Sequence, residues 1–532
     1  MHPVTPPPRS TSPSAVQVEI EPRPSNAPPS EIARAGRGFV WIGAAKLLFL
    51  LLGFVVQFGL PRVLADPGEY GLLSAAIAFI VILTNAMTSS MVQTTSKLVA
   101  EAGGRAIGRP LAARHAALAS ALALAVLGGA GLVAERMLSN QALTPLVRLG
   151  SVVVVSYAIY ATAIGALNGA HAFERQARLD ATFSTVRTLG LLGGGLAFGV
   201  ALSAMAGFAM ASLTMALFGA LAAGLYRGPE HGVPTLATHL RILLPIGLYQ
   251  LALNGLLQLD IEILVTGTTL TAAAGGASES AAAEAGAHAA GLYRAAQTLA
   301  FVPYQLVSSV TLVLFPVVAH GASSGEGGEA QTRQTVRAAL RFSLLFVAGL
   351  LAPLAGGAAG AVRLAFPSSY GSAEAVVPVL ALSQLFFAMG VLHATVLVGR
   401  GRLWRVVAIT LAALALSLAC GALAWQLVPS ALPVATAAAT ATGSAVFAVL
   451  TAVALRADLD AGLAPGAVAR AAVAAAAAVA VARGLSGQGP VAGMVALAVA
   501  GLAYLGVLVA TRELGAADLA LVRRLASGFR GR

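Results

Sequence analysis

The sequence predicts an all-α integral membrane protein with about 14 transmembrane helices, in two six-helix lobes related by a parallel repeat plus two C-terminal helices. Of the 532 residues, 58% are hydrophobic and 10% are charged, whereas a soluble domain carries about 25% charged residues. Apolar stretches of about 20 to 30 residues, long enough to cross a bilayer, follow one another along the chain. Basic residues gather in every second gap between these stretches.

The apolar stretches define the expected spans in order. They lie near 39–60, 70–95, 111–134, 149–170, 181–201, 203–226, 240–268, 293–319, 336–365, 374–399, 404–427, 432–455, 466–484 and 490–511. Roughly 26 of the 33 basic residues fall on one side of this alternation and 6 on the other, and Lys46 lies inside the first span. Because cytoplasmic loops carry the excess of Lys and Arg, both termini are expected in the cytoplasm.

Four regions follow from the spans. They are a disordered Pro- and Ser-rich tail at 1–35, an N-lobe at 36–226, a C-lobe at 227–460, and two further helices with a cytoplasmic tail at 461–532. Within the C-lobe, the Ala- and Gly-rich gap 271–288 is expected to be a flexible outer insertion. The single cysteine, Cys420, forms no intramolecular disulfide and is expected to be a small core residue.

The two lobes are expected to be copies of one unit. D-P-G-E-Y-G-L-L at 66–73 precedes the second span, and A-A-G-L-Y-R-A-A at 289–296 precedes the eighth. Both put Gly and Tyr at the start of a helix that runs inward. The offset of six helices keeps the same orientation in the membrane, so the repeat axis would run along the membrane normal.

These junctions resemble the oligosaccharide flippases of polysaccharide biosynthesis, the O-antigen (Wzx-like) type, within the multidrug, oligosaccharidyl-lipid and polysaccharide exporter superfamily. The segment 60–71 is similar to that family's R-x-L-G-P-x-E-Y-G turn, with Ala65 where Gly is usual. The other matching positions are Trp41 and Lys46 in the first span, D-I-E-I-L-V-T-G at 260–267, G-L-Y-R-A-A at 291–296 and L-F-P at 314–316.

The resemblance implies a transporter that flips undecaprenyl-diphosphate-linked oligosaccharide across the bacterial cytoplasmic membrane by alternating access. Its partners would be this lipid-linked substrate, membrane lipids and the polysaccharide polymerase machinery. The alternatives are a cation-coupled multidrug antiporter of the MATE type, a lipid II flippase and, less favoured, a membrane glycosyltransferase or polymerase. The predicted outer loops lack gathered catalytic groups, so neither an enzyme nor a cofactor or metal is expected, and the basic excess is a loop bias rather than a nucleic-acid site.

Polar residues inside apolar spans mark the expected pathway, because a polar group in hydrocarbon is costly unless it is paired or hydrated. Span seven has one such stripe and span two another, and span eight adds two residues. The predicted cavity residues in these spans are Gln250, Asn254, Gln258, Glu262, Asn85, Ser89, Gln93, Arg294 and Gln297. Thr266 continues the stripe of span seven. Interhelical hydrogen bonding that serves only packing is the alternative reading.

Charged residues in the spans have more than one reading each. Lys46 and Arg294 are predicted to neutralise the substrate diphosphate; alternatively Lys46 snorkels to headgroups, and Arg294 anchors the interface or pairs with Glu262 or Asp260. Asp260 and Glu262 are candidates for ion coupling, and Asp260 alternatively pairs with a residue on another helix or is a solvated acid at the interface. His393 is expected to be a hydrogen-bonded packing residue, with proton carriage as the alternative.

Overall fold

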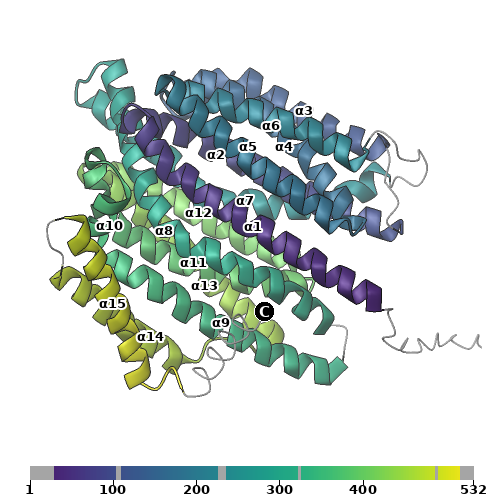
Figure 1. The fold of residues 1–532 in the computed structure, drawn as a ribbon. Helices are drawn as coiled ribbons and strands as arrows, with labels where there is room; N and C mark the ends of the chain where they lie inside the picture. Colours follow the sequence, from purple (N-terminus) through teal and green to yellow (C-terminus); the bar gives the residue numbers. More distant parts are fainter. Residues whose placement is uncertain (1–28, 104–108, 226–234, 322–324, 486–488, 516–532) are drawn as a thin grey trace, which may run out of the picture.

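The chain forms a bundle of long helices, seen in a computed structural model that describes residues 29–103, 109–225, 235–321, 325–485 and 489–515 (Figure 1). In these ranges there are fourteen α-helices of 20 residues or more, one short α-helix, a short π-helix, two short 3-10 helices and no strand. The prediction of an all-α membrane protein with about 14 helices is confirmed. Among the described residues, twelve helices are long and apolar enough to cross a membrane. The tails expected at the two ends fall mostly outside the described residues.

The first half of the bundle has six helices. They are α1 (Pro29–Val63), α2 (Pro67–Glu101), α3 (Arg109–Gly131), α4 (Leu143–Gly169), α5 (Phe173–Phe198) and α6 (Ala201–Ala223). A short π-helix, Leu132–Met137, extends α3. Within this group α2 packs on α4, α1 packs on α5, and both α4 and α5 pack on α6.

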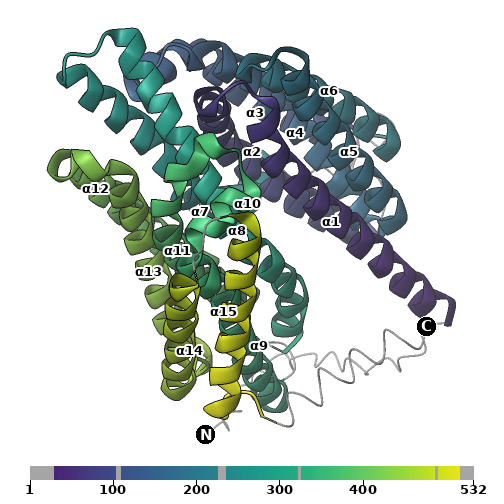
Figure 2. The same cartoon turned by 60° about the vertical axis from the view of Figure 1, so that its left-hand side comes forward.

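The second half has the remaining helices. They are α7 (Leu236–Ala274), α8 (Glu279–Gly321), α9 (Gly325–Gly356), α10 (Ala358–Ala365), α11 (Val377–Gly399), α12 (Leu403–Leu427), α13 (Leu432–Leu459), α14 (Pro465–Gly484) and α15 (Pro490–Ala510). Helices α7–α9 and α11–α13 pack on one another, while α14 and α15 pack on α9 and lie at the edge farthest from α3–α6 (Figure 1). The two halves meet where α2 packs on α7 and α8 (Figure 2).

Two segments differ from the sequence expectation. The ninth span, expected as one helix over 336–365, is broken at Gly357 into α9 and α10. The gap 271–288, expected as a flexible insertion, is helical at both ends, because α7 runs to Ala274 and α8 starts at Glu279. Alanine is the best helix former, and the gap is rich in alanine, so the two helices extend toward each other and leave a short turn.

The start of α2 explains the motif at 66–71 in physical terms. The Asp66 carboxylate caps the helix by accepting hydrogen bonds from the backbone N–H groups of Gly68 (2.6 Å) and Glu69 (3.1 Å). Pro67 occupies the first turn, where its missing N–H costs nothing. The Glu69 carboxylate accepts from the N–H of Ala201 at the start of α6 (2.6 Å). The motif therefore fixes a helix start and joins it to a second helix.

The bundle has two distinct ends. The Asp66 end carries the α1–α2 and α7–α8 turns, which face each other across one hollow. The Arg400 end is the opposite end and carries the α11–α12 turn.

Candidate functional site

A cavity of about 340 Å³ lies inside the first half of the bundle, bounded by α1, α2, α4, α5 and α6. Arg294 of α8 reaches into its wall from the second half. Its polar lining consists of Gln57, Tyr70, Ser74, Thr84, Asn85, Tyr157, Arg187 and Arg294. None of the described residues in the lining is acidic, so the formal charge of the wall is positive.

Arg187 of α5 supplies one of the two cavity cations. Its guanidinium lies over the ring of Phe49 in α1, 4.6 Å from the ring centroid, and contacts the hydroxyl of Tyr157. Its Nε is buried, and the described residues offer this atom no hydrogen-bond acceptor. Gln57 Oε1, in the same wall, is also buried and unpartnered. Since buried polar atoms are normally paired, these two mark places where a ligand could bond.

Arg294 of α8 supplies the second cation. Its Nη1 donates to Gln258 Oε1 in α7 (3.1 Å) and to Gln297 Oε1 in α8 (2.6 Å). It also lies beside the hydroxyl of Tyr70 in α2. These contacts hold the guanidinium at the boundary between the two halves, where Arg suits planar, bidentate recognition of phosphate oxygens.

Asp260 anchors a buried polar cluster behind Arg294. The Tyr293 hydroxyl donates to Asp260 Oδ2 (2.8 Å), Gln297 Nε2 donates to the carboxylate (3.3 Å to Oδ2), and Thr440 of α13 lies 3.4 Å away. Gln297 Nε2 also donates to the Leu257 carbonyl (3.1 Å). Asp260 thus pairs with residues on other helices, as one of its predicted readings stated. The cluster connects α7, α8 and α13.

The stripe of α7 lies in helix contacts rather than in the cavity wall. Asn85 Nδ2 of α2 donates to Asn254 Oδ1 (2.7 Å), and Asn254 Nδ2 donates to the Gln250 carbonyl (2.8 Å). Thr266 donates to the Met137 carbonyl (2.8 Å). Glu262 is 6% exposed, and both its carboxylate oxygens lack a side-chain partner within the described part of the chain. The predicted stripe therefore joins the two halves of the bundle in this conformation.

The other predicted residues lie apart from this cavity. Lys46 is exposed, one turn of α1 before Phe49, and does not line the cavity. Ser89 is half-buried and Gln93 is exposed, both nearer the Arg400 end of α2. His393 is buried, with Thr451 Oγ1 3.5 Å from its Nδ1. Of the predicted site residues, Asn85 and Arg294 line the cavity, and Gln258 and Gln297 bond to Arg294.

Arg187 and Gln57 are cavity residues that the sequence argument did not select. The available signal for Arg187 was a charged residue inside the expected span 181–201. Gln57 lies among apolar residues of the first span and gave the same kind of signal more weakly. Neither belongs to a stripe with helical spacing, so no local pattern singles them out.

Two larger hollows, of about 730 and 500 Å³, lie at the Asp66 end. The larger lies between the α1–α2 turn, residues 139–142 and the start of α8, and its charged lining residues are acidic. The carboxylates that line the two hollows do not suit an anionic ligand.

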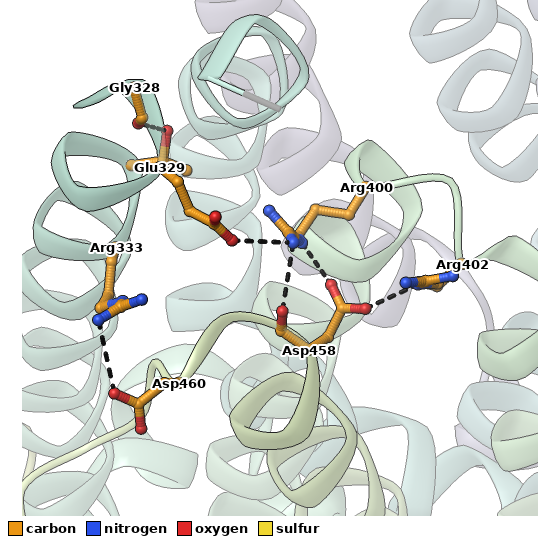
Figure 3. Close-up of polar contacts among 8 residues, drawn as sticks. Gly328, Glu329, Arg333, Arg400, Arg402, Asp458 and Asp460 are labelled. Carbon is orange, nitrogen blue, oxygen red and sulfur yellow. Dashed lines mark hydrogen bonds and ion pairs between the residues drawn. The ribbon is translucent and has the colours of Figure 1, made fainter. Parts of the chain in front are cut away.

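Ion pairs cluster at the Arg400 end (Figure 3). Asp458 of α13 accepts from Arg400 and from Arg402 (2.7 Å), while Arg400 also contacts Glu329 of α9 (3.3 Å). Arg333 of α9 pairs with Asp460 (3.6 Å). These residues all belong to the second half of the bundle, so the network ties α9, α11, α12 and α13 together.

The architecture is that of known transporters. No protein-family profile matches the chain, and no curated protein matches it in sequence. Among solved structures it is similar to the lipid II flippase MurJ in an inward closed conformation, with a TM-score of 0.68 and 13% identity over 89% of this chain and 99% of that one.

Two further solved structures are similar to this chain in fold. A MOP superfamily transporter from Pyrococcus furiosus has a TM-score of 0.58 and 13% identity over 80% of this chain and 96% of that one. An inward-facing multidrug resistance MATE family transporter of the MOP superfamily has a TM-score of 0.57 and 14% identity over 77% of this chain and 94% of that one. At such low identity these likenesses define the fold, which is the fold shared by MOP superfamily transporters.

Proposed function

We propose that this protein is a flippase that moves an anionic, lipid-linked sugar across a membrane by alternating access. The observation that carries the proposal is the cavity that contains Arg187 and Arg294 and no acidic residue in its described lining. A diphosphate that leaves water needs cationic partners, and a buried site with unpartnered polar atoms offers them. The fold shared with transporters supports movement of the ligand rather than its chemical conversion.

The specific substrate we propose is undecaprenyl-diphosphate-linked oligosaccharide for cell-surface polysaccharide. The resemblance of segment 60–71 to oligosaccharide flippases supports this choice. In this proposal both termini are cytoplasmic, the membrane is the bacterial inner membrane, and the polysaccharide polymerase machinery receives the product. The two lobes, 36–226 and 227–460, would rock about the cavity while the lipid tail stays in the bilayer. Asp260 and Glu262 stay the candidates for ion coupling.

Lipid II is the second candidate substrate. It is favoured by the likeness to MurJ, whose solved chain is covered almost completely. The shared chemistry of both candidates is a lipid diphosphate that carries sugar. A drug antiporter of the MATE type fits less well where its substrates are cations, because two arginines without a carboxylate in the wall would repel them.

A translocation assay in proteoliposomes tests the proposal and distinguishes the candidate substrates. Purified protein is reconstituted with fluorescent undecaprenyl-diphosphate-oligosaccharide, with lipid II, or with a cationic dye, and label reaching the opposite leaflet is measured. We expect the oligosaccharide lipid to move, and Arg187→Gln and Arg294→Gln each to slow its movement at least about tenfold. The matched control is Arg148→Gln, an exposed arginine outside the cavity. Movement of the dye alone would refute the flippase, and movement of lipid II alone would change the substrate.

A further inference from the structure

Two buried histidines join the halves of the bundle near the Arg400 end. His115 lies in α3 and His239 in the first turn of α7, and both are 0% exposed. Their Nε2 atoms are 2.9 Å apart, and their ring centroids are 4.8 Å apart. On its other side, His115 Nδ1 lies 2.9 Å from Thr162 Oγ1 in α4. One chain of hydrogen bonds thus runs from α4 through α3 to α7.

The hydrogen-bond partners determine where the protons lie. The Thr162 hydroxyl donates its one hydrogen to the Ala158 carbonyl (2.9 Å), so it accepts from His115 Nδ1–H. A neutral His115 then has a bare Nε2, which accepts a hydrogen bond from His239 Nε2–H. His239 is therefore left with an unprotonated Nδ1. The hydrogen bonds between Thr162 and His115 and between His115 and His239 are therefore both formed when both rings are neutral.

His239 Nδ1 is the open position in this chain. It is buried, and it has no hydrogen-bond partner within the described residues. A bare imidazole nitrogen has a free lone pair, and at physiological pH it is basic enough to take up a proton. Residues 236–238, directly before His239, are exposed, so the pair lies within one helical turn of the protein surface.

We propose that His115 and His239 form a proton-binding site that holds α7 against α3 and α4 while neutral and releases it when protonated. A proton taken from water by His239 Nδ1 makes an imidazolium. This cation would be buried without an acceptor for its new N–H, and uncompensated buried charge is costly. Among the described residues, the charged or titratable groups that act on the pair are Arg114 of α3 and each imidazole on the other. Arg114 is itself a cation and adds repulsion.

The contacts near His239 allow the first turns of α7 to move when the histidine pair is protonated. Leu243, one turn beyond His239, packs against a small cluster of α2, α3 and α4 that contains Met91, Ala119 and Ala158. Pro245 follows inside the helix and removes one backbone hydrogen bond, which makes that point easier to bend. Protonation would therefore loosen the first turns of α7 from the first half of the bundle while the rest of α7 stays packed on α8, α12 and α13.

Fluorescence quenching of the whole protein in lipid nanodiscs tests this site without any transported substrate. Cys420→Ala removes the single thiol, Ala113→Cys in α3 carries bimane, and Ala237→Trp in α7 is the quencher; both positions are exposed. We expect quenching at pH 8 and its loss toward pH 5. A contact linked to one proton changes its population ratio by up to about tenfold per pH unit.

Variants test whether the pH dependence of quenching comes from His115 and His239. His239→Gln and His115→Gln keep hydrogen-bonding side chains without the proton site, so the pH dependence should disappear in both. His393→Gln, a buried histidine of α11, should keep it. In parallel, nitrogen-15 NMR of histidine-labelled wild-type protein should show one ring protonated at Nδ1 and its partner at Nε2 at pH 8, and a doubly protonated ring at pH 5.

The outcomes are separable from those of the flippase proposal, because neither readout requires flipping. Equal quenching at pH 8 and pH 5 in the parent protein would overturn the site. So would a pH response that persists in both glutamine variants, or an NMR spectrum in which the two rings stay neutral at pH 5.

Discussion

Gly71 and Gly291 bring the backbones of α2 and α8 into direct contact at the Asp66 end. A Cβ on Gly71 would lie 1.8 Å from the Ala287 carbonyl oxygen, and one on Gly291 would lie 1.9 Å from the Pro67 carbonyl oxygen. Both glycines belong to the Gly and Tyr junctions that the sequence repeats six helices apart. The two repeated junctions therefore touch each other, through Gly71 of the first and Gly291 of the second.

Adding one methyl group at this contact should open it. Gly71→Ala or Gly291→Ala forces the two backbones apart, at a cost of about 1–3 kcal/mol to the closed arrangement. We expect greater labelling of cysteines placed beside the contact, such as Ser74→Cys, by a membrane-impermeant thiol reagent in a Cys420→Ala background. Gly128→Ala is the control, because a Cβ there meets nothing within 4 Å. Unchanged labelling in both alanine variants would mean that the contact opens by another route.

Arg187 and Arg294 should matter more than Lys46. The two arginines line the cavity, whereas Lys46 is exposed and outside it. If Lys46 snorkels, Lys46→Gln should lower export less than about threefold, while the arginine variants lower it at least about tenfold. Export of labelled polysaccharide from cells with equal membrane protein levels gives the comparison. A large loss in Lys46→Gln that Lys46→Arg rescues would instead support substrate contact by Lys46 in another conformation.

Thiol reactivity should separate the cavity from the stripe of α7. Cysteines at Gln57 and Asn85 face the cavity, whereas Asn254, Gln258 and Glu262 are buried between helices. In a Cys420→Ala background, we expect small water-soluble reagents to modify the first two at least about tenfold faster, because reaction requires access. Equal rates at all five positions would show that the halves separate along α7 in the membrane.

Glu513 should make the stability of the C-terminal helices depend on pH. Burial raises the pKa of this carboxyl, but hydrogen bonds from Arg341 of α9 and Arg470 of α14 outweigh burial, so its pKa lies below the usual value of 4.5. A lowered folded pKa means that the carboxylate stabilises the fold above about pH 4.5 and that this contribution is lost as the pH falls through the folded pKa. Thermal unfolding from pH 7 to pH 3 should show the loss.

Glu513→Gln tests this assignment. It removes the charge that Arg341 and Arg470 share, so we expect a loss of about 1–3 kcal/mol at pH 7 and a flatter pH dependence below pH 4.5. Glu284→Gln, at an exposed carboxylate of α8, is the control. If the variant is as stable as the parent at pH 7, the contacts of Glu513 with Arg341 and Arg470 do not stabilise the protein.

Much of the fold followed from hydropathy and charge, because every segment that crosses a bilayer in this protein must be an apolar helix that satisfies its own backbone hydrogen bonds. Long apolar stretches gave α2, α7 and α13 within a few residues of their observed cores. The break at Gly357 did not follow from hydropathy, which continues through it; the local signal is the Gly356–Gly357 pair, and α10 beyond it packs on α15. The helical ends of 271–288 were missed because composition suggested flexibility where alanine in fact favours helix.

The candidate site could be predicted only in part. Arg294 was selected as a charged residue inside span eight, whereas helical spacing selected Asn85 in the stripe of α2. Helical spacing overstated the stripe of α7, since spacing shows which residues share a face but not whether that face meets water or another helix. Arg187, Gln57 and the pairing of His115 with His239 depend on contacts between helices far apart in the sequence, which no local pattern contains.

The length of α7 has a practical consequence. Its 39 residues would span about 58 Å, nearly twice the roughly 30 Å of bilayer hydrocarbon. The α7–α8 hairpin, drawn in teal, therefore projects past the rest of the bundle, with its turn at residues 275–278 exposed (Figure 1). A small rigid protein grafted into this turn as a continuous helical fusion would give electron microscopy an alignment marker. Without one, a membrane protein with so little mass outside the micelle is hard to orient.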